Sequence, residues 1–156
     1  GKFRRQRQMC IRDSIIAAIR KIQSQSTSNP SSISQAAAVE ALNGTQSFIK
    51  KRAKSFSDRR NFVVNYLNSI PGITCLMPKG AFYVFPSCKG LIGKKTKIKN
   101  DTDFVQKLLE KQNVAVVQGS AFGLDGYFRI SYATSMKKLK IAMERIKLFC
   151  ERLGQV

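Results

Sequence analysis

A single arginine stands out as the residue of this chain best suited to bind a ligand. Arg129 is the only charged residue of the segment 127–133, whose other side chains are aromatic, branched or small and favour a β-strand. Such an arginine can lie on an edge strand with its head in water. It can also clamp a carboxylate, because its planar fork of N–H donors matches the two carboxylate oxygens. The segment alone leaves both interpretations open.

The chain is strongly basic. It has 156 residues, of which 28 are Lys or Arg and 9 are Asp or Glu, for a net charge of +19 without any histidine. Anionic partners of several classes fit such a balance. The basic residues are spread over predicted helices and one loop, 89–100, without the interleaved aromatic residues of single-strand nucleic-acid sites. We therefore expect solvated basic helix faces and do not favour nucleic acid as a partner.

The four cysteines are widely scattered, and no metal site is expected. Cys10, Cys75, Cys88 and Cys150 form no C-x-x-C pair, and no histidine could complete a ligand set. Free thiols in a reducing compartment are the simplest account and predict a cytoplasmic protein. The apolar runs are too short to span a bilayer and no signal-like segment is visible, so no membrane partner is expected.

Hydrophobic periodicity divides the chain into three parts. Residues 1–13 are basic and aperiodic, and are interpreted as a foreign or disordered tail. Residues 14–45 predict two short helices. Between them lies a hydroxyl-rich loop over 23–30, and Gly44 is expected in a left-handed position after the second helix. Residues 46–153 predict a compact α/β unit.

The predicted elements of this third part alternate between helices and short strands. In chain order they are a long helix over 46–69, strands over 73–76 and 80–85, a helix over 101–112, strands over 114–117 and 127–133, and a last helix with an apolar stripe from Leu139 to Leu153. In the helix over 101–112, Phe104, Val105, Leu108 and Leu109 are expected to face inward.

Four segments, in this order, resemble one enzyme family. They are the hydroxyl-rich run 23–30, Gly-Ala-Phe-Tyr-Val-Phe-Pro at 80–86, Gly-Ser-Ala-Phe-Gly at 119–123, and Tyr-Phe-Arg-Ile-Ser-Tyr-Ala at 127–133. Together they resemble the C-terminal part of class I pyridoxal-phosphate aminotransferases, most closely the bacterial aspartate aminotransferase branch. Each motif is weak evidence by itself, whereas four in register are specific.

The resemblance implies a fold-type I architecture. In that family a homodimer places its active sites between the subunits, and between a large cofactor domain and a small C-terminal domain. Residues 46–153 would form the small domain, an α/β unit with a long helix and a small sheet packed against helices. Residues 14–45 would be a remnant of the large domain, and the chain a C-terminal fragment.

The resemblance also assigns substrate-binding residues. Arg129 falls on the arginine that grips the substrate α-carboxylate, in an enzyme moving an amino group between an amino acid, aspartate-like or aromatic, and a 2-oxo acid. Phe82 and Tyr83 are candidates for lining the substrate pocket, with ordinary strand packing as the alternative. The family also has a loop that reaches the neighbouring subunit's active site, and its counterpart here is Ser26, Thr27, Ser28 and Asn29.

No catalytic residue is expected within this chain. The family's Schiff-base lysine, the aspartate on the pyridine nitrogen and most phosphate ligands have no counterpart here, and Lys50 lies in an amphipathic helix. We therefore expect the chain to be inactive alone, with pyridoxal phosphate bound by the full-length parent. The alternatives are another fold-type I aminotransferase, such as a kynurenine or aromatic type, or a basic nucleic-acid-binding module.

Overall fold

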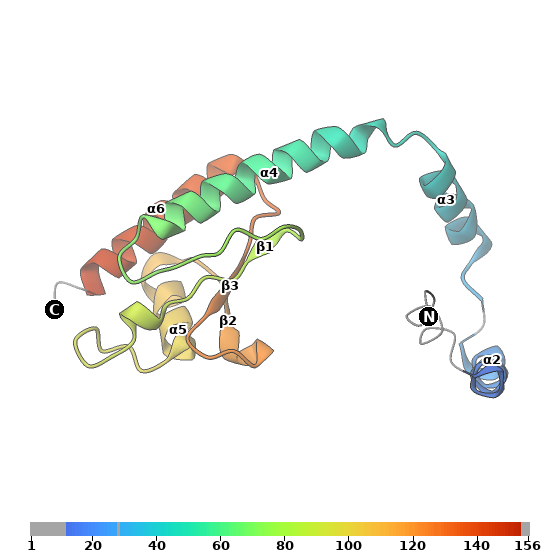
Figure 1. The fold of residues 1–156 in the computed structure, drawn as a ribbon, viewed down its shortest axis with the longest axis horizontal. Coiled ribbons are helices and arrows are strands. Elements are labelled where there is room, and N and C mark those ends of the chain that lie inside the picture. Colours follow the sequence, from blue (N-terminus) through green and yellow to red (C-terminus); the bar gives the residue numbers. More distant parts are fainter. Residues whose placement is uncertain (1–11, 28, 154–156) are drawn as a thin grey trace, which may run out of the picture. The chain divides into compact units, whose positions relative to one another are not determined.

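The computed structural model describes residues 12–27 and 29–153, which belong to two compact units, Gly1–Gln46 and Ser47–Val156 (Figure 1). Most of the predicted basic tail, residues 1–11, lies outside the described residues. No helix in the described part of the chain has the length and hydropathy needed to cross a membrane.

The first unit contains two helices that bury none of their described side chains. These are α2, Asp13–Ser26, and α3, Ser32–Asn43. Four isoleucines recur at helical spacing in α2: Ile16 is half-buried, and Ile15, Ile19 and Ile22 are between 43% and 67% exposed. Apolar residues at helical spacing need a partner surface to be buried, and the described residues of this unit provide none. The assignment of residues 14–45 to a larger cofactor domain stays a prediction.

Helix α2 is longer than its sequence predicts. The hydroxyl-rich segment 23–30 was expected to be a loop, but the helix continues through Ser26. The hydroxyl of Ser26 donates to the carbonyl of Ile22 at 2.9 Å, and that of Thr27 donates to Gln23 at 3.1 Å. By bonding back to carbonyls of their own helix, these hydroxyls are accommodated in its last turn, although their polarity is typical of loops.

Gly44 ends α3 by a different geometry from the predicted one. Its φ is −72°, so it is not left-handed. Glycine is still required there, because a Cβ would lie 2.6 Å from the carbonyl oxygen of Glu40. Glycine is favoured at this position because its backbone lies close to the Glu40 carbonyl, and not because its φ is positive.

The second unit confirms the predicted α/β class, with a long helix and a small sheet packed against helices. Its elements are α4 (Ser47–Asn68), β1 (Tyr83–Val84), the 3₁₀ turn η1 (Lys89–Leu91), α5 (Asp101–Gln112), β2 (Val117–Gln118), the 3₁₀ turn η2 (Gly119–Phe122), β3 (Phe128–Ser131) and α6 (Met136–Leu153). Helices α4 and α6 lie side by side (Figure 1).

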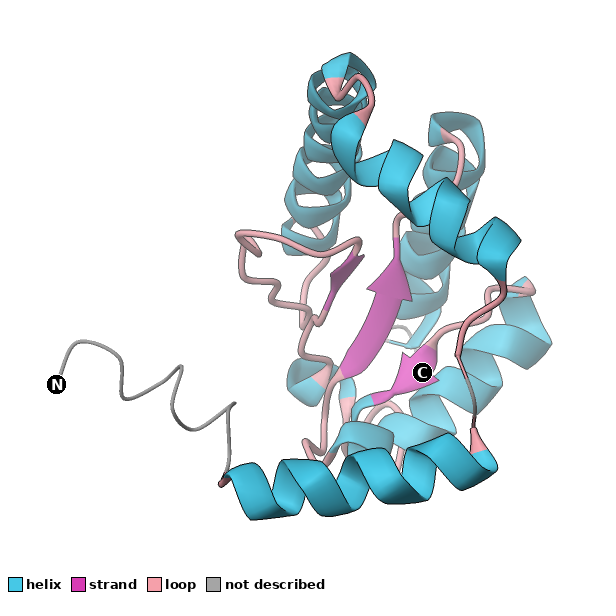
Figure 2. Ribbon diagram, turned by 90° about the vertical axis from the view of Figure 1, so that its right-hand side faces the viewer, coloured by secondary structure: helices cyan, strands magenta, loops and turns pink. Residues whose placement is uncertain are grey.

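The three strands form an antiparallel sheet in the order β1-β3-β2, with β3 in the centre (Figure 2). Burial along β3 alternates, as expected for a strand with one covered face. Phe128 and Ile130 are buried, whereas Arg129 is half-buried and Ser131 is exposed. The sheet therefore has one core face and one open face.

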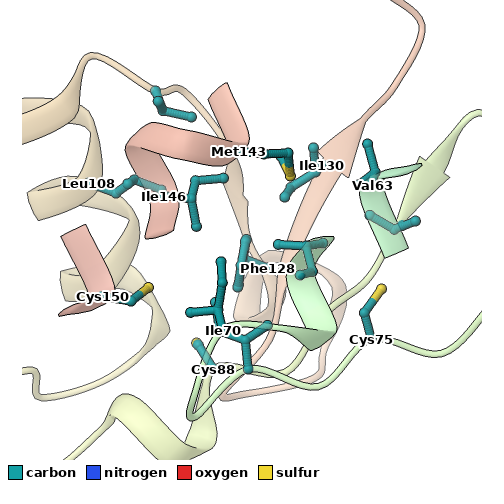
Figure 3. Close-up of a cluster of buried hydrophobic side chains, with 14 of the residues drawn as sticks. Val63, Ile70, Cys75, Cys88, Leu108, Phe128, Ile130, Met143, Ile146 and Cys150 are labelled. Carbon is teal, nitrogen blue, oxygen red and sulfur yellow. The ribbon is translucent and has the colours of Figure 1, made fainter. Parts of the chain in front are cut away.

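The core lies between the covered face of the sheet and the helices (Figure 3). Phe104 of α5 contacts Phe128 and Phe149, with ring centres 5.1 and 5.5 Å apart. The predicted inward positions Phe104 and Leu108 are fully buried. Leu109 was also predicted inward, but this is wrong, since its side chain is 48% exposed.

The predicted strand over 73–76 is absent, although Ile73 and Cys75 are buried. The side chain of Asn68 accounts for this: it accepts from the Cys75 N–H at 2.7 Å and donates to the Cys75 carbonyl at 2.9 Å. At Cys75 a side-chain amide therefore takes the place of a strand partner. Thr74 keeps a single antiparallel bridge to Ser87, with backbone hydrogen bonds of 3.2 and 2.8 Å. The strand predicted over 114–117 also shifts, to Val117–Gln118.

Candidate functional site

The sheet register places Arg129 on the open face. Tyr83 pairs with Ser131, and Val117 pairs with Arg129. Directly paired residues share a face, and alternate residues of one strand share a face. Tyr83, Val117, Arg129 and Ser131 therefore line the face opposite the core, and we call this surface the Arg129 face.

The Arg129 guanidinium lies between two aromatic rings. Its Cζ is 4.5 Å from the centre of the Phe122 ring and 5.4 Å from that of Tyr83. In the described part of the chain, no hydrogen bond or ion pair joins this side chain to another residue. The two ion pairs found there are Lys107–Asp103 and Lys147–Glu151. The rings orient the guanidinium, and its N–H donors remain available to an anion.

Further rings support Phe122. The Phe85 ring packs edge-on against Phe122, with centres 6.0 Å apart, and stacks on Tyr127 at 5.7 Å. The Phe122 side chain is 49% exposed, so a ligand can reach it. Phe122 was not among the predicted site residues, and its place in the Gly-Ser-Ala-Phe-Gly motif was the signal that could have indicated it.

Gly119 shapes the turn that carries Phe122. Its N–H donates to the Tyr127 carbonyl at 2.7 Å, and its carbonyl accepts from Leu124. A Cβ at this position would contact the carbonyl oxygen of Leu124, and it would lie 2.8 Å from the Tyr127 Cβ. Gly123 follows in the left-handed region, at φ 76°. The two glycines allow the chain to double back toward β3.

A buried carboxylate holds the same turn. Asp101, only 2% exposed, accepts the Ser120 N–H at 2.8 Å. Burial acts to raise the pKa of Asp101, but hydrogen bonds from Ser120, from its own backbone and from Gly126 outweigh it and lower the pKa below its ordinary value. Asp101 was predicted only as the start of a helix. The structure shows that it joins α5 to the motif beside Arg129.

Phe82 and Tyr83 are both exposed, at 53% and 40%. Their rings meet edge to face at 5.5 Å, and Tyr83 also contacts the Arg129 guanidinium. Buried Tyr132 holds their backbone: its N–H donates to the Phe82 carbonyl at 2.8 Å and its hydroxyl to the Ala81 carbonyl at 2.9 Å. The assignment of these rings to a substrate pocket stays a prediction.

The predicted cross-subunit loop belongs to the first unit. Ser26 ends α2, Thr27 bonds back to that helix, and Asn29 is exposed in the following loop. Ser28 lies outside the described residues. The proposed contact of this segment with a neighbouring active site stays a prediction.

The described thiols and acids offer little for metal chemistry. The described residues contain no cluster of three or more metal-binding side chains. Burial raises the pKa of Cys75 to about 11, and burial together with nearby negative charge raises the pKa of Cys88 and Cys150 to about 12. These three cysteines are free and packed in the core.

The comparison with known families agrees with the motifs around Arg129. Residues 8–146 match the family model described as aminotransferase class I and II. The chain belongs to this aminotransferase family. It is 58% identical to the aspartate aminotransferase of Rhizobium meliloti strain 1021 over 144 residues. It is 51% identical to the aspartate/prephenate aminotransferase of Cereibacter sphaeroides over 144 residues.

The aminotransferase fold is also found in solved structures. The crystal structure of the aspartate aminotransferase from Rhizobium meliloti superimposes with a TM-score of 0.84 and 57% identity over 89% of this chain. The aromatic aminotransferase from Pyrococcus horikoshii matches with a TM-score of 0.75 and 36% identity over 87% of the chain. The chain spans 35% of the first curated relative and 36% of either solved chain.

Proposed function

We propose that this chain is the substrate-carboxylate half of an aminotransferase active site, and that the complete enzyme moves an amino group between an amino acid and a 2-oxo acid. The observation that carries this proposal is the unpaired, ring-flanked guanidinium of Arg129 on an open sheet face of a family member. A cation that has no hydrogen-bond or ion-pair partner among residues 12–27 and 29–153, and that two rings hold in one orientation, suits a carboxylate ligand.

Arg129 would fix both the position and the rotation of the amino acid. Two parallel N–H···O bonds hold a carboxylate plane, so the substrate Cα–H is kept in one direction for proton removal. Each charge-assisted hydrogen bond contributes on the order of 1.5–3 kcal/mol. Lysine would keep the charge but lose the fork, and with it the control of rotation.

The substrate side chain is aspartate-like or aromatic in this proposal. The relatives are named aspartate or aspartate/prephenate aminotransferases, and one solved neighbour is named an aromatic aminotransferase. The exposed rings of Phe82, Tyr83 and Phe122 offer apolar contact to either side chain. A panel of aspartate, phenylalanine, tyrosine and kynurenine would separate this enzyme from a kynurenine or aromatic type.

Pyridoxal phosphate is the cofactor that the proposed reaction requires, and when bound it supplies the electron sink that makes the Cα–H bond acidic. The Arg129 face offers a guanidinium for the substrate carboxylate but no Schiff-base amine for the cofactor, because Tyr83, Val117, Arg129 and Ser131 include no lysine. The lysine and phosphate ligands would belong to the rest of the enzyme. In this proposal the complete enzyme is a cytoplasmic homodimer, with Ser26, Thr27, Ser28 and Asn29 reaching the partner subunit.

The proposal is tested by a chimera in which this chain replaces the matching 144 residues of the Rhizobium meliloti aspartate aminotransferase. The chimera should convert aspartate and a 2-oxo acid in the presence of pyridoxal phosphate. The chain alone should show neither a lysine-bound cofactor absorbance band nor turnover. A well-folded chimera without turnover, or an active isolated chain, would contradict the proposal.

A further inference from the structure

Two adjoining hollows of the second unit have several cationic residues and, among the described residues, no acidic residue in their lining. Their volumes are about 400 and 430 Å³, and Thr96 and Leu153 line both. The cations come from the loop after η1, from α5 and from the end of α6: they are Lys94, Lys95, Lys97, Lys107, Lys111 and Arg152. We call this surface the basic hollow.

Most of these charges are uncompensated. Within the described residues, Lys107 is the one cation of these six that forms an ion pair. Its Nζ lies 3.0 Å from the carboxylate of Asp103. Asp103 also accepts the backbone N–H of Lys99 at 2.9 Å. Like charges gathered on one surface repel one another, so an anion that binds there relieves this repulsion.

The loop that carries three of these lysines is tied to the body of the unit. The hydroxyl of Thr96 donates to the Leu91 carbonyl at 2.7 Å, and the Lys107 ammonium donates to the Lys97 carbonyl at 2.7 Å. Ile98 is buried in the core with 1% exposure. A loop anchored in this way presents its cations with little further ordering on binding.

Lys97 occupies an uncommon backbone conformation. Its φ is 56°, in the left-handed region that glycine and asparagine adopt more readily. A side chain other than these two is found there only where the surrounding structure holds it. Lys97 lines the same hollow as Lys107, Lys111 and Arg152.

The chemistry of the lining favours phosphate groups over nucleic-acid bases. The one aromatic residue of the two linings, Phe149, is 2% exposed and cannot stack on a base. Several lysines and an arginine without an aromatic platform match a chain of phosphates. We propose that the basic hollow binds a linear oligophosphate. This proposal does not depend on the aminotransferase activity.

The test is calorimetric titration of the whole chain with inorganic tripolyphosphate at about physiological ionic strength, where exposed long-range attraction is screened. The test variant combines Lys97→Gln, Lys111→Gln and Arg152→Gln. The control combines Lys137→Gln, Lys138→Gln and Lys140→Gln, which change the net charge equally. These lie near the start of α6, and Lys138 is roughly 20 Å along the helix from Arg152.

We expect saturable binding of tripolyphosphate that the test variant weakens roughly tenfold and the control less than about twofold. Circular dichroism and thermal melting verify that both variants fold. Arg152→Gln alone, at an exposed position, is the milder variant and should weaken binding by about twofold to threefold. Absence of saturable binding, or equal weakening by test and control variants, would overturn the proposal.

Two further titrations identify the anion. ATP should bind with an affinity similar to that of tripolyphosphate, because the shared phosphate chain carries the interaction. Much tighter binding of ATP would show that the hollow reads a base, which contradicts the proposal. Tighter binding of single-stranded oligothymidine, lost in the same triple variant, would assign the surface to nucleic acid and would equally contradict it.

Discussion

The guanidinium of Arg129 lies 4.5 Å from the centre of the Phe122 ring, although the two residues belong to different elements, β3 and η2. The contact orients the side chain without using its N–H donors. The Asp101 carboxylate holds the turn that brings Phe122 to this place. The position of one charged group thus depends on a ring, a glycine turn and a buried acid.

Replacing Arg129 by lysine in the chimera should lower kcat/KM for aspartate roughly 30-fold to 1,000-fold, because the loss of the bidentate fork costs about 2–4 kcal/mol. Steady-state kinetics measure this change. Arg152→Lys, at an exposed position on α6, is the matched control and should leave kcat/KM unchanged. Equal effects of the two substitutions would remove Arg129 from the carboxylate site.

Replacing Phe122 by leucine should raise the KM for aspartate about 3-fold to 10-fold, since a cation–π contact of about 1 kcal/mol is lost and the guanidinium becomes less ordered. Phe122→Tyr keeps the ring and should restore the original KM. The comparison is made by steady-state kinetics of the chimera. A tyrosine variant as impaired as the leucine variant would exclude the ring as the orienting element.

Gly119→Ala should destabilise the second unit by about 1–3 kcal/mol, because the new methyl group is forced against Leu124 and Tyr127. Urea unfolding of the isolated chain measures the change. Gly80→Ala is the control, since a Cβ there meets nothing within 4 Å. If both substitutions changed the free energy of unfolding equally, the tight turn at Gly119 would not be the cause.

Asp101 should cause the stability of the folded chain to fall as the pH becomes acidic. Its pKa is lowered in the folded chain, so the ionised carboxylate contributes stability that is fully present above the unfolded pKa of about 3.9. This contribution is lost as the pH falls through the lower folded pKa. Asp103 also has a lowered pKa, caused first by its hydrogen bond from Lys99, and acts in the same direction.

The measurement is thermal unfolding between about pH 7 and pH 2.5, a window that spans the ordinary carboxyl pKa. Asp101→Asn should lower the melting temperature at neutral pH and flatten its decline in acid. Asp103→Asn is the comparison, because its carboxylate is less buried. An unchanged acid decline in the Asp101→Asn variant would show that the Ser120 hydrogen bond does not link protonation to folding.

The buried thiols should react slowly in the folded chain. Burial, the main cause, raises the pKa of Cys75 to about 11 and that of Cys88 and Cys150 to about 12, so the reactive thiolate is scarce near pH 8. In a Cys10→Ser variant, a thiol-specific dye should label these three residues only as the protein unfolds in urea. Rapid labelling without urea would show that Cys75, Cys88 and Cys150 are not buried in the folded chain.

Local pattern was sufficient for much of this protein. The 3.6-residue period of α6 and of most of α5 predicted which side chains are buried, because each helix rests one face on the core. The strand around Arg129 and the aminotransferase motifs were likewise visible in the order of the residues. Local pattern failed at Cys75 and at the end of α2, where the side chains of Asn68 and Ser26 bond to the backbone. It also failed at Leu109, which is 48% exposed although it was predicted to face inward.

The setting of Arg129 was decided by tertiary structure. The register of β1 brings Tyr83 to the guanidinium from 46 residues away in sequence. The return of the chain after η2 brings Phe122 to it from 7 residues away. Asp101 binds the turn at Ser120 across 19 residues. Residue type and spacing encode an amphipathic face, which is a local property. Contacts between elements depend on how those faces pack, and only the assembled fold specifies them.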